Sequence, residues 1–520
     1  MAGEYHRETH LQVGMYTSLG TFLTPLQNSD MGVDTSPFSP PSAQIPTNVT
    51  RIIRALNHRD SDGVTQVAFY QRGVGTDNLQ DMVVGGLTGN DIGNHIREAY
   101  AFVANNFNPE SQKELDDVTT PLDQIVLLGF SRGAYTARAI ASLISDIGLL
   151  TKLGMESFWA IFGDWMKQDV EGQQSLWFVA TYKDVAEKFQ QEYGRKIAFT
   201  DKVYRDTLIE QGLTRWGMPI RAVGVWDTVG ALGIPIPWDS DNVKPFSFVN
   251  TRVPRAVQHA FHALAIDERR NLFTPTMWEE PDQAGHLKTL KQCWFPGSHS
   301  NIGGSYPDAG ISNITLAWMV SQLEEHDGGI LSFNPDYLDF VQDLNNRFYA
   351  SEPEPVRPWG FGKLYDSSLV MDPVTLANAL LPGARTLGRY HRVDTANGKQ
   401  TSVPLRGTGE SIHRCVRVRI DGGGRGLEEV VGRSAVGKFL NVLKKAVGAT
   451  EDNTAEGKLY RSPALGNYVL VQPAVDQDGA DNSGPVSGVF WRGKDGKGDL
   501  PEDVMGRTEI RLLKRSLGVS

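Results

Sequence analysis

The sequence is poor in cysteine: its 520 residues contain only Cys293 and Cys415, and these form no C-x-x-C pair. A disulfide framework is therefore not expected, and the composition is typical of a reducing compartment. No apolar run is long enough to span a bilayer. The polar N-terminal region lacks the apolar core of a signal peptide. These absences predict a soluble, cytoplasmic protein.

Positive charge is also scarce. The 51 lysines and arginines are outnumbered by 61 aspartates and glutamates, which gives a net charge of −10 without a long basic run. Nucleic acid is not an expected partner, because its phosphates are bound by clustered Lys and Arg. The phosphate loop G-x-x-x-x-G-K-[ST] is absent. The pair His6 and His10 has no third ligand nearby, so we expect neither a metal nor a cofactor.

What the sequence does contain is a nucleophile-elbow pattern. Residues 125–128 are an apolar run typical of a buried strand, Gly-Phe-Ser-Arg-Gly follows at 129–133, and helix-compatible residues come next. This order places a serine on a sharp, strained turn, where a Cβ at either glycine would collide with the strand or the helix. We therefore predict that Ser131 is a nucleophile. The alternative is an ordinary glycine-rich turn between a strand and a helix.

The flanking segments alternate between strand and helix patterns. Strands are expected at residues 10–17, 64–71, 220–226 and 289–295, and helices at 48–59, 94–106, 257–270 and 313–323. Repeated strand–helix units predict an α/β protein with a mostly parallel, doubly wound sheet. We expect a catalytic domain over residues 1–330 and a C-terminal extension over 331–520, packed on that domain or following it.

Two further polar residues follow predicted strands. Asp227 comes directly after the strand at 220–226, and His299 comes shortly after the strand at 289–295. The carboxyl ends of parallel strands share one edge of a sheet, so we expect both to meet Ser131 there. The chain order Ser, Asp, His is that of α/β-hydrolases. Ser131 would attack a carbonyl, His299 would carry the proton, and Asp227 would orient the imidazole.

Each partner of the serine has alternatives. His259 and His262 could serve as the base, but both fall in the helix expected at 257–270, where we expect packed and hydrogen-bonded side chains. His299 is preferred because glycines on both sides would let its imidazole approach the serine. Asp and Glu in the sequence Asp-Glu-Arg-Arg at 267–270 could replace Asp227, but the adjacent arginines favour ion pairs.

Residues 148–216 interrupt the alternation directly after the nucleophile helix. This position is typical of a helical cap, and the insertion carries an aromatic cluster that includes Phe158, Phe162 and Trp165. We expect these three, together with Phe130, to line the substrate site or to touch a lipid surface. The alternative is ordinary core packing.

Four segments resemble a large family of uncharacterised α/β-hydrolase domains of fungi and bacteria: GFSRGAYTARA, VWDTVGALGIP, HALAIDERRNLF and WFPGSHSNIGG. Its bacterial members include phospholipase effectors of type VI secretion. The resemblance covers roughly residues 10–380. It implies an α/β-hydrolase fold and a triad of Ser131, Asp227 and His299, and it leaves the substrate open.

One position departs from the pattern of that family. Members usually carry Asp-Gly-Thr-Trp after the first strand, whereas this chain has Leu19, Gly20, Thr21 and Phe22. An oxyanion hole needs two N–H donors, which we expect from the backbone of Arg132 and of the Gly20–Thr21 loop. Backbone donors survive the loss of the acidic side chain.

The sequence thus predicts a serine hydrolase that cleaves a carboxylic ester through an acyl-enzyme, with a (phospho)lipid ester as the narrower hypothesis. Its partner would be a small-molecule or lipid substrate, with peripheral membrane contact as part of the lipid hypothesis. Two alternatives stay open: a catalytically silent scaffold that binds a ligand or partner, and an enzyme of secondary metabolism that processes lactones or thioesters. The oligomeric state is left open.

Overall fold

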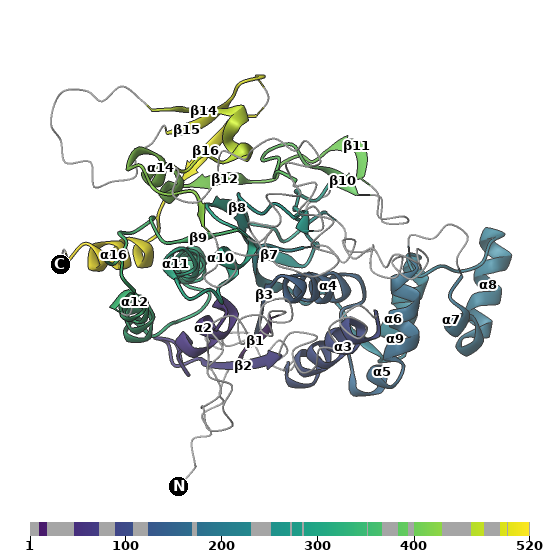
Figure 1. Cartoon of the computed structure of the whole chain (residues 1–520). Coiled ribbons are helices and arrows are strands. Elements are labelled where there is room, and N and C mark those ends of the chain that lie inside the picture. Colours follow the sequence, from purple (N-terminus) through teal and green to yellow (C-terminus); the bar gives the residue numbers. More distant parts are fainter. Residues whose placement is uncertain are drawn as a thin grey trace, which may run out of the picture.

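The computed structural model describes residues 10–17, 46–71, 89–107, 123–168, 174–229, 251–270, 273–282, 285–350, 352–366, 383–393, 400–428, 459–472, 489–496 and 498–518 (Figure 1).

A sheet of ten strands, in the order β14-β15-β16-β12-β8-β7-β6-β3-β1-β2, forms the centre of the molecule. Its strands are β1 (His10–Thr17), β2 (Thr65–Gln71), β3 (Gln124–Phe130), β6 (Ile220–Trp226), β7 (Val257–Ala265), β8 (Thr289–Phe295), β12 (Glu410–His413), β14 (Tyr468–Val471), β15 (Phe490–Gly493) and β16 (Leu500–Asp503). All pairings from β2 across to β16 are parallel, and only β15 pairs antiparallel, with β16 and β14. The predicted α/β class with a mostly parallel sheet is confirmed.

Helices cover both faces of this sheet. Helices α2 (Asn48–Ala55), α11 (Gly310–Glu325) and α12 (Pro335–Ala350) belong to one hydrophobic core, and α3 (Gly89–Asn106) and α4 (Arg132–Ile147) belong to the other. Strand β3 supplies both cores from alternate positions: Val126 and Leu128 enter the first, and Ile125 and Leu127 enter the second. Burial on both faces explains why β3 is a continuous apolar run.

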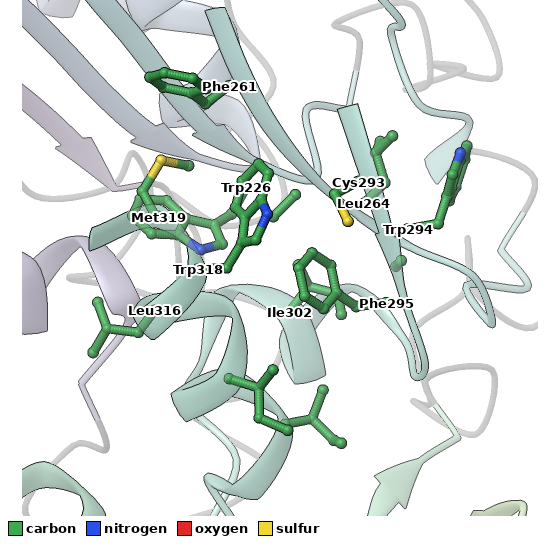
Figure 2. Close-up of a cluster of buried hydrophobic side chains, with 14 of the residues drawn as sticks. Trp226, Phe261, Leu264, Cys293, Trp294, Phe295, Ile302, Leu316, Trp318 and Met319 are labelled. Atoms are coloured by element: carbon green, nitrogen blue, oxygen red, sulfur yellow. The ribbon is translucent and has the colours of Figure 1, made fainter. Parts of the chain in front are cut away.

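The first core is dense in aromatic side chains. Figure 2 shows Trp226 of β6 and Phe295 of β8 among the residues that face Trp318 and Met319 of α11. Helix α11 is buried over most of its length, and the Trp318 indole N–H donates to Asp503 Oδ2 at 2.7 Å. Asp503 belongs to β16, so the C-terminal strands hold the helix that supports the centre of the sheet.

Residues 257–270 contain a strand, and the predicted amphipathic helix there is wrong. Strand β7 (Val257–Ala265) lies between β6 and β8 and is buried at every position except Gln258. Burial on both faces removes the polar–apolar alternation that marks a half-exposed strand. Its alanines and leucine are also good helix formers, so a short apolar run of this kind does not separate the two structures.

The insertion predicted at residues 148–216 consists mainly of helices. Two short strands, β4 (Leu149–Leu150) and β5 (Thr214–Arg215), pair antiparallel where it leaves and rejoins the main body. Between them lie α5 (Lys152–Glu156), α6 (Phe158–Met166), α7 (Leu176–Thr181), α8 (Lys183–Tyr193) and α9 (Lys202–Glu210), at the right of Figure 1.

The C-terminal part of the chain adds to the same sheet. Strand β12 pairs with β8, and β16 pairs with β12. Two short pairs lie outside the sheet: β9 (Leu364–Tyr365) with β13 (Leu427–Glu428), and β10 (His391–Val393) with β11 (Gln400–Pro404). Helices α14 (Arg414–Asp421) and α16 (Arg507–Ser516) complete this part. The division into a domain of residues 1–330 and an extension of 331–520 stays a prediction.

Candidate active site

Ser131 lies on a sharp turn between β3 and α4. Its backbone has φ 60° and ψ −123°, a conformation that residues other than glycine rarely adopt. A Cβ on Gly129 would lie 2.4 Å from the carbonyl oxygen of Gly133 and 2.7 Å from Cα of Ala134, so glycine is required there. The Ser131 N–H donates to the carbonyl oxygen of Trp226 at 3.1 Å, which ties the turn to the end of β6.

Asp227 and His299 meet beside this turn. Asp227 directly follows β6 with φ 39°, and His299 begins the short helix α10 (His299–Gly303) after β8. The His299 Nδ1 lies 2.6 Å from Asp227 Oδ2, and both side chains are buried. Because a carboxylate can only accept, Nδ1 carries the proton and Nε2 is left with its lone pair. Nε2 is buried, and within the described part of the chain no atom, Ser131 Oγ included, hydrogen-bonds to it.

The imidazole of His299 contacts two phenyl rings. The ring centroid of Phe130 is 4.6 Å away, and that of Phe273 is 5.0 Å away in an edge-on arrangement. Phe130 directly precedes Ser131, so this contact places the imidazole against the elbow. Burial lowers the pKa of His299, and Asp227 opposes that effect. His299 is therefore held as the neutral imidazole, the form that can accept a proton.

The carboxylate of Asp227 accepts four hydrogen bonds. Oδ1 accepts from the backbone N–H of Ala265 at 3.0 Å and from Arg385 Nη1 at 3.2 Å. Oδ2 accepts from Arg385 Nη2 at 3.1 Å, in addition to the bond from His299. Burial alone would raise the pKa of Asp227, but Arg385 and His299 outweigh it and hold the pKa below its usual range. The acid is thus ionised and fixed in one orientation.

His262, the alternative base, has a structural place. It lies on β7, where its Nε2 accepts the backbone N–H of Thr228 at 3.0 Å and its Nδ1 lies 3.2 Å from Gln292 Oε1. Burial lowers the pKa of His262 to about 3. Both ring nitrogens are occupied, and the ring supports the residue that follows Asp227.

The alternative acids are occupied as well. Glu268 forms a buried ion pair with Arg270, Oε1 to Nε at 2.9 Å, and its Oε2 accepts the backbone N–H of His299 at 3.2 Å. Burial opposes ionisation of Glu268, but Arg270 outweighs it and lowers the pKa to about 2. Asp267 Oδ2 accepts the N–H of Gly297 at 2.7 Å and the hydroxyl of Tyr460 at 3.0 Å. These acids therefore position the loop that carries His299.

The remaining predicted site residues fall in three places. Gly20 and Thr21, with Leu19, lie outside the residues that the structure describes. Arg132 is the first residue of α4. Phe158, Phe162 and Trp165 are fully buried in the second core, where Phe158 lies 5.7 Å from the ring of Tyr100 on α3. Their role in binding substrate stays a prediction.

Local sequence does not mark Arg385 or Phe273 as residues of the site. Arg385 is 5% exposed and lies 158 positions from the aspartate that it contacts. Its local sequence, Gly-Ala-Arg-Thr, matches no catalytic motif, and no pattern within a single sequence links it to Asp227. Phe273 follows the Asp-Glu-Arg-Arg segment and looks like any apolar residue. Both contacts arise from tertiary folding alone.

In the ranges given above, no cluster of three or more His, Cys, Asp or Glu side chains could hold a metal ion. Within those ranges, no helix combines the length and the apolar character needed to cross a membrane.

Comparison with known proteins identifies relatives. The family described as "T6SS, Phospholipase effector Tle1-like, catalytic domain" matches residues 33–322. Uncharacterized protein YEL023C of Saccharomyces cerevisiae is 27% identical over 254 residues, which are 48% of this chain and 32% of that protein. The chain thus spans about a third of the length of this curated relative. The predicted resemblance to a family that spans fungi and bacteria and includes type VI secretion effectors is confirmed.

Two solved structures show a weak likeness. An uncharacterized protein from Pseudomonas aeruginosa is 15% identical, with a TM-score of 0.31 over 72% of this chain and 53% of that one. The Tle1 effector bound to the VgrG spike of the type 6 secretion system is 18% identical, with a TM-score of 0.26 over 58% of this chain and 52% of that one.

Proposed function

The chain belongs to the family of Tle1-like phospholipase effector catalytic domains, and we propose that it is a serine hydrolase that cleaves a carboxylic ester of a lipid or phospholipid. Ser131 is the nucleophile, His299 the general base and acid, and Asp227 the residue that orients the imidazole. The fold that carries them is an α/β-hydrolase fold, with residues 148–216 as its cap.

One observation carries the proposal: a buried Asp–His pair leaves a lone pair on His299 Nε2 beside a strained serine turn. Nε2 has no partner among the residues that the structure describes, although a buried imidazole nitrogen normally finds one. Phe130, the residue before Ser131, contacts the imidazole ring at 4.6 Å. A serine hydroxyl or a reacting substrate is the partner that such a nitrogen would take.

The reaction follows from these groups. Ser131 Oγ bonds to the carbonyl carbon of the ester while its proton passes to His299 Nε2. The tetrahedral intermediate collapses, the bond to the leaving alkoxide breaks, and His299 returns the proton to that oxygen, which leaves an acyl-enzyme. Water then repeats the sequence: it loses a proton to His299, attacks the acyl carbon and releases the fatty acid, and Ser131 regains the proton.

Charge develops on two groups during each step, the imidazole and the carbonyl oxygen, and residues of the site would stabilise both charges. The imidazolium forms 2.6 Å from the ionised Asp227. The oxyanion would be bound by the backbone N–H of Arg132, at the N-terminus of the 16-residue helix α4, and by the Gly20–Thr21 loop. Losing one such donor costs about 10²–10³ in rate, so both donors matter.

Labelling with a fluorophosphonate probe tests this function without knowledge of the substrate. Ser131 Oγ would displace fluoride from phosphorus, and mass spectrometry of the digest would map the adduct to Ser131. The control is Ser131→Ala, checked for folding by its thermal melt and expected to take no label. A folded wild-type protein that takes no label, or that is labelled at another serine, would contradict the proposal.

A further inference from the structure

We propose that Arg385 is a positioning residue of the catalytic triad: it holds the Asp227 carboxylate in the orientation that aligns His299 and keeps the imidazole a free base at acidic pH. The inference rests on the proposed function. It assigns a part of the active site to a stretch of chain beyond residues 33–322, the stretch that the family match covers.

The contact is a two-point grip on a buried carboxylate. Arg385 Nη1 donates to Asp227 Oδ1 at 3.2 Å, and Nη2 donates to Oδ2 at 3.1 Å. The arginine side chain is 4% exposed and that of Asp227 is fully buried. A planar guanidinium that binds both oxygens fixes the plane of the carboxylate, which a single donor does not. The plane of the carboxylate in turn sets the direction of the bond to His299 Nδ1.

The charges of Arg385 and Asp227 have a second effect, on the protonation of His299. Arg385 and Asp227 together are neutral, so with a neutral His299 these three side chains carry no net charge. Protonation of His299 adds a buried positive charge that the carboxylate, already paired, offsets only in part. Without Arg385, the same protonation would neutralise an unpaired buried carboxylate and would be favoured. Removal of Arg385 should therefore let His299 protonate at higher pH.

Other charged and titratable groups around the site stay the same in this comparison. Arg270 lowers the pKa of His299 and Glu268 raises it. The groups that face Arg385, Asp227 or their neighbours from the surrounding elements are Glu268, Arg270, His262, Arg138 and Tyr390. Among the described residues, the donors to Asp227 are Ala265, His299 and Arg385, so Arg385 is the arginine that binds both carboxylate oxygens.

The segment that carries Arg385 is tied to the main body. The N–H of Gly383 donates to the carbonyl oxygen of Arg269 at 2.9 Å, and the N–H of Gly388 donates to Glu410 Oε2 on β12 at 2.9 Å. Arg389, four residues after Arg385, pairs with Asp495 at 3.0 Å and is partly exposed. Residues 383–390 thus reach the triad as an anchored segment, and Arg389 provides a matched arginine away from it.

The experiment measures the rate of fluorophosphonate labelling of Ser131 against pH in the full chain. Wild type is compared with Arg385→Gln, Arg385→Lys and the control Arg389→Gln, and thermal melts give the folded fraction of each. We expect Arg385→Gln to label about 10²-fold more slowly, because the base is misplaced. On the acid limb of the pH profile, the labelling rate falls as His299 takes up a proton. In this variant the acid limb should move to higher pH by about one unit or more, because a neighbouring charge shifts a pKa by that much. Arg389→Gln should match wild type in both.

A lysine at position 385 keeps the positive charge but cannot bind both carboxylate oxygens as a planar guanidinium does, so it separates the two effects. Arg385→Lys should keep the acid limb of wild type and label more slowly on the plateau. If folded Arg385→Gln shows the rate and acid limb of wild type, the inference is wrong. If Arg385→Gln does not fold, Arg385→Lys provides the test. A plateau labelling rate equal to that of wild type in Arg385→Lys overturns the inference. A wild type that never labels at Ser131 instead refutes the proposed function, which keeps the two failures distinct.

Discussion

The phenyl ring of Phe130 and the imidazole of His299 lie 4.6 Å apart between centroids, at 33° to one another. Phe130 ends β3 and His299 begins α10, the helix after β8, and β6 and β7 separate the two strands in the sheet. Room for this contact comes from Gly303 on α10, where a Cβ would lie 2.1 Å from the ring of Phe130. The contact joins the residue before Ser131 to the imidazole of the proposed base.

Ser131→Ala should abolish ester turnover and leave the fold intact. Loss of a triad serine costs on the order of 10⁶ in kcat. Turnover of short p-nitrophenyl esters and a thermal melt measure the two effects. Ser157→Ala is the control, because Ser157 precedes α6 without a side-chain cap hydrogen bond and should keep wild-type turnover. Wild-type turnover in Ser131→Ala would rule out its role.

His299→Ala and His262→Ala should fail in different ways. The His299 variant should fold and lose turnover, because its ring supplies the base. The His262 variant should lose about 1–3 kcal/mol of unfolding free energy, because it leaves the N–H of Thr228 buried and unpaired. Chemical denaturation and kcat on the same preparations separate them. The reverse pattern, a stable inactive His262 variant and an active His299 variant, would exchange their roles.

The acid limb of kcat/KM should lie below pH 6.5, the ordinary pKa of histidine. Burial lowers the pKa of His299, so the imidazole stays neutral, and active as a base, to lower pH than a free histidine. Phe273→Ala should move this limb upward toward 6.5, since it removes the ring that shields one edge of the imidazole. Phe340→Ala, an exposed position on α12, serves as the control. An unchanged limb in Phe273→Ala would show that this ring does not set the pKa.

Phe162→Ala should destabilise the protein by about 3–5 kcal/mol, the usual cost of removing a buried aromatic side chain. Phe162 is 1% exposed and stacks on Phe158, whereas Trp159 on the same helix is 49% exposed. Trp159→Ala is therefore the matched control and should melt near wild type. A Phe162→Ala protein with a wild-type melt and reduced turnover would favour the substrate role over the core role.

Removal of residues 331–520 should give a protein that aggregates and takes no probe. The truncation exposes the edge of β8, where β12 pairs in parallel and Glu410 accepts the indole N–H of Trp294 at 2.9 Å. It also removes Arg385 from Asp227. Size-exclusion chromatography and labelling at Ser131 measure both losses. A monomeric product that labels like wild type would establish residues 1–330 as an independent catalytic domain.

Much of the central sheet could be predicted from local sequence. Strands β1, β6 and β8 match the predicted ranges residue for residue. Strand β6 is buried along almost its whole length, and a strand of this kind is a short apolar run that ends at a polar residue, here Asp227. The turn at Ser131 was also predictable, because the Gly-x-Ser-x-Gly pattern that it requires lies within five consecutive residues, 129–133. Strand β7 was mistaken for a helix, because its burial on both faces depends on β6 and β8 and leaves no alternation in its own sequence.

The sequence by itself determined which residues could carry the chemistry: a serine on a strained turn and two polar residues at the ends of parallel strands. Only the tertiary structure decided how they are held. Arg385 reaches Asp227 from 158 positions away, and Phe273 and Glu268 reach His299 from a neighbouring loop. The physical reason is range: strand, turn and helix preferences act over a few residues, whereas a buried carboxylate is paired by whichever cation the packed chain brings beside it.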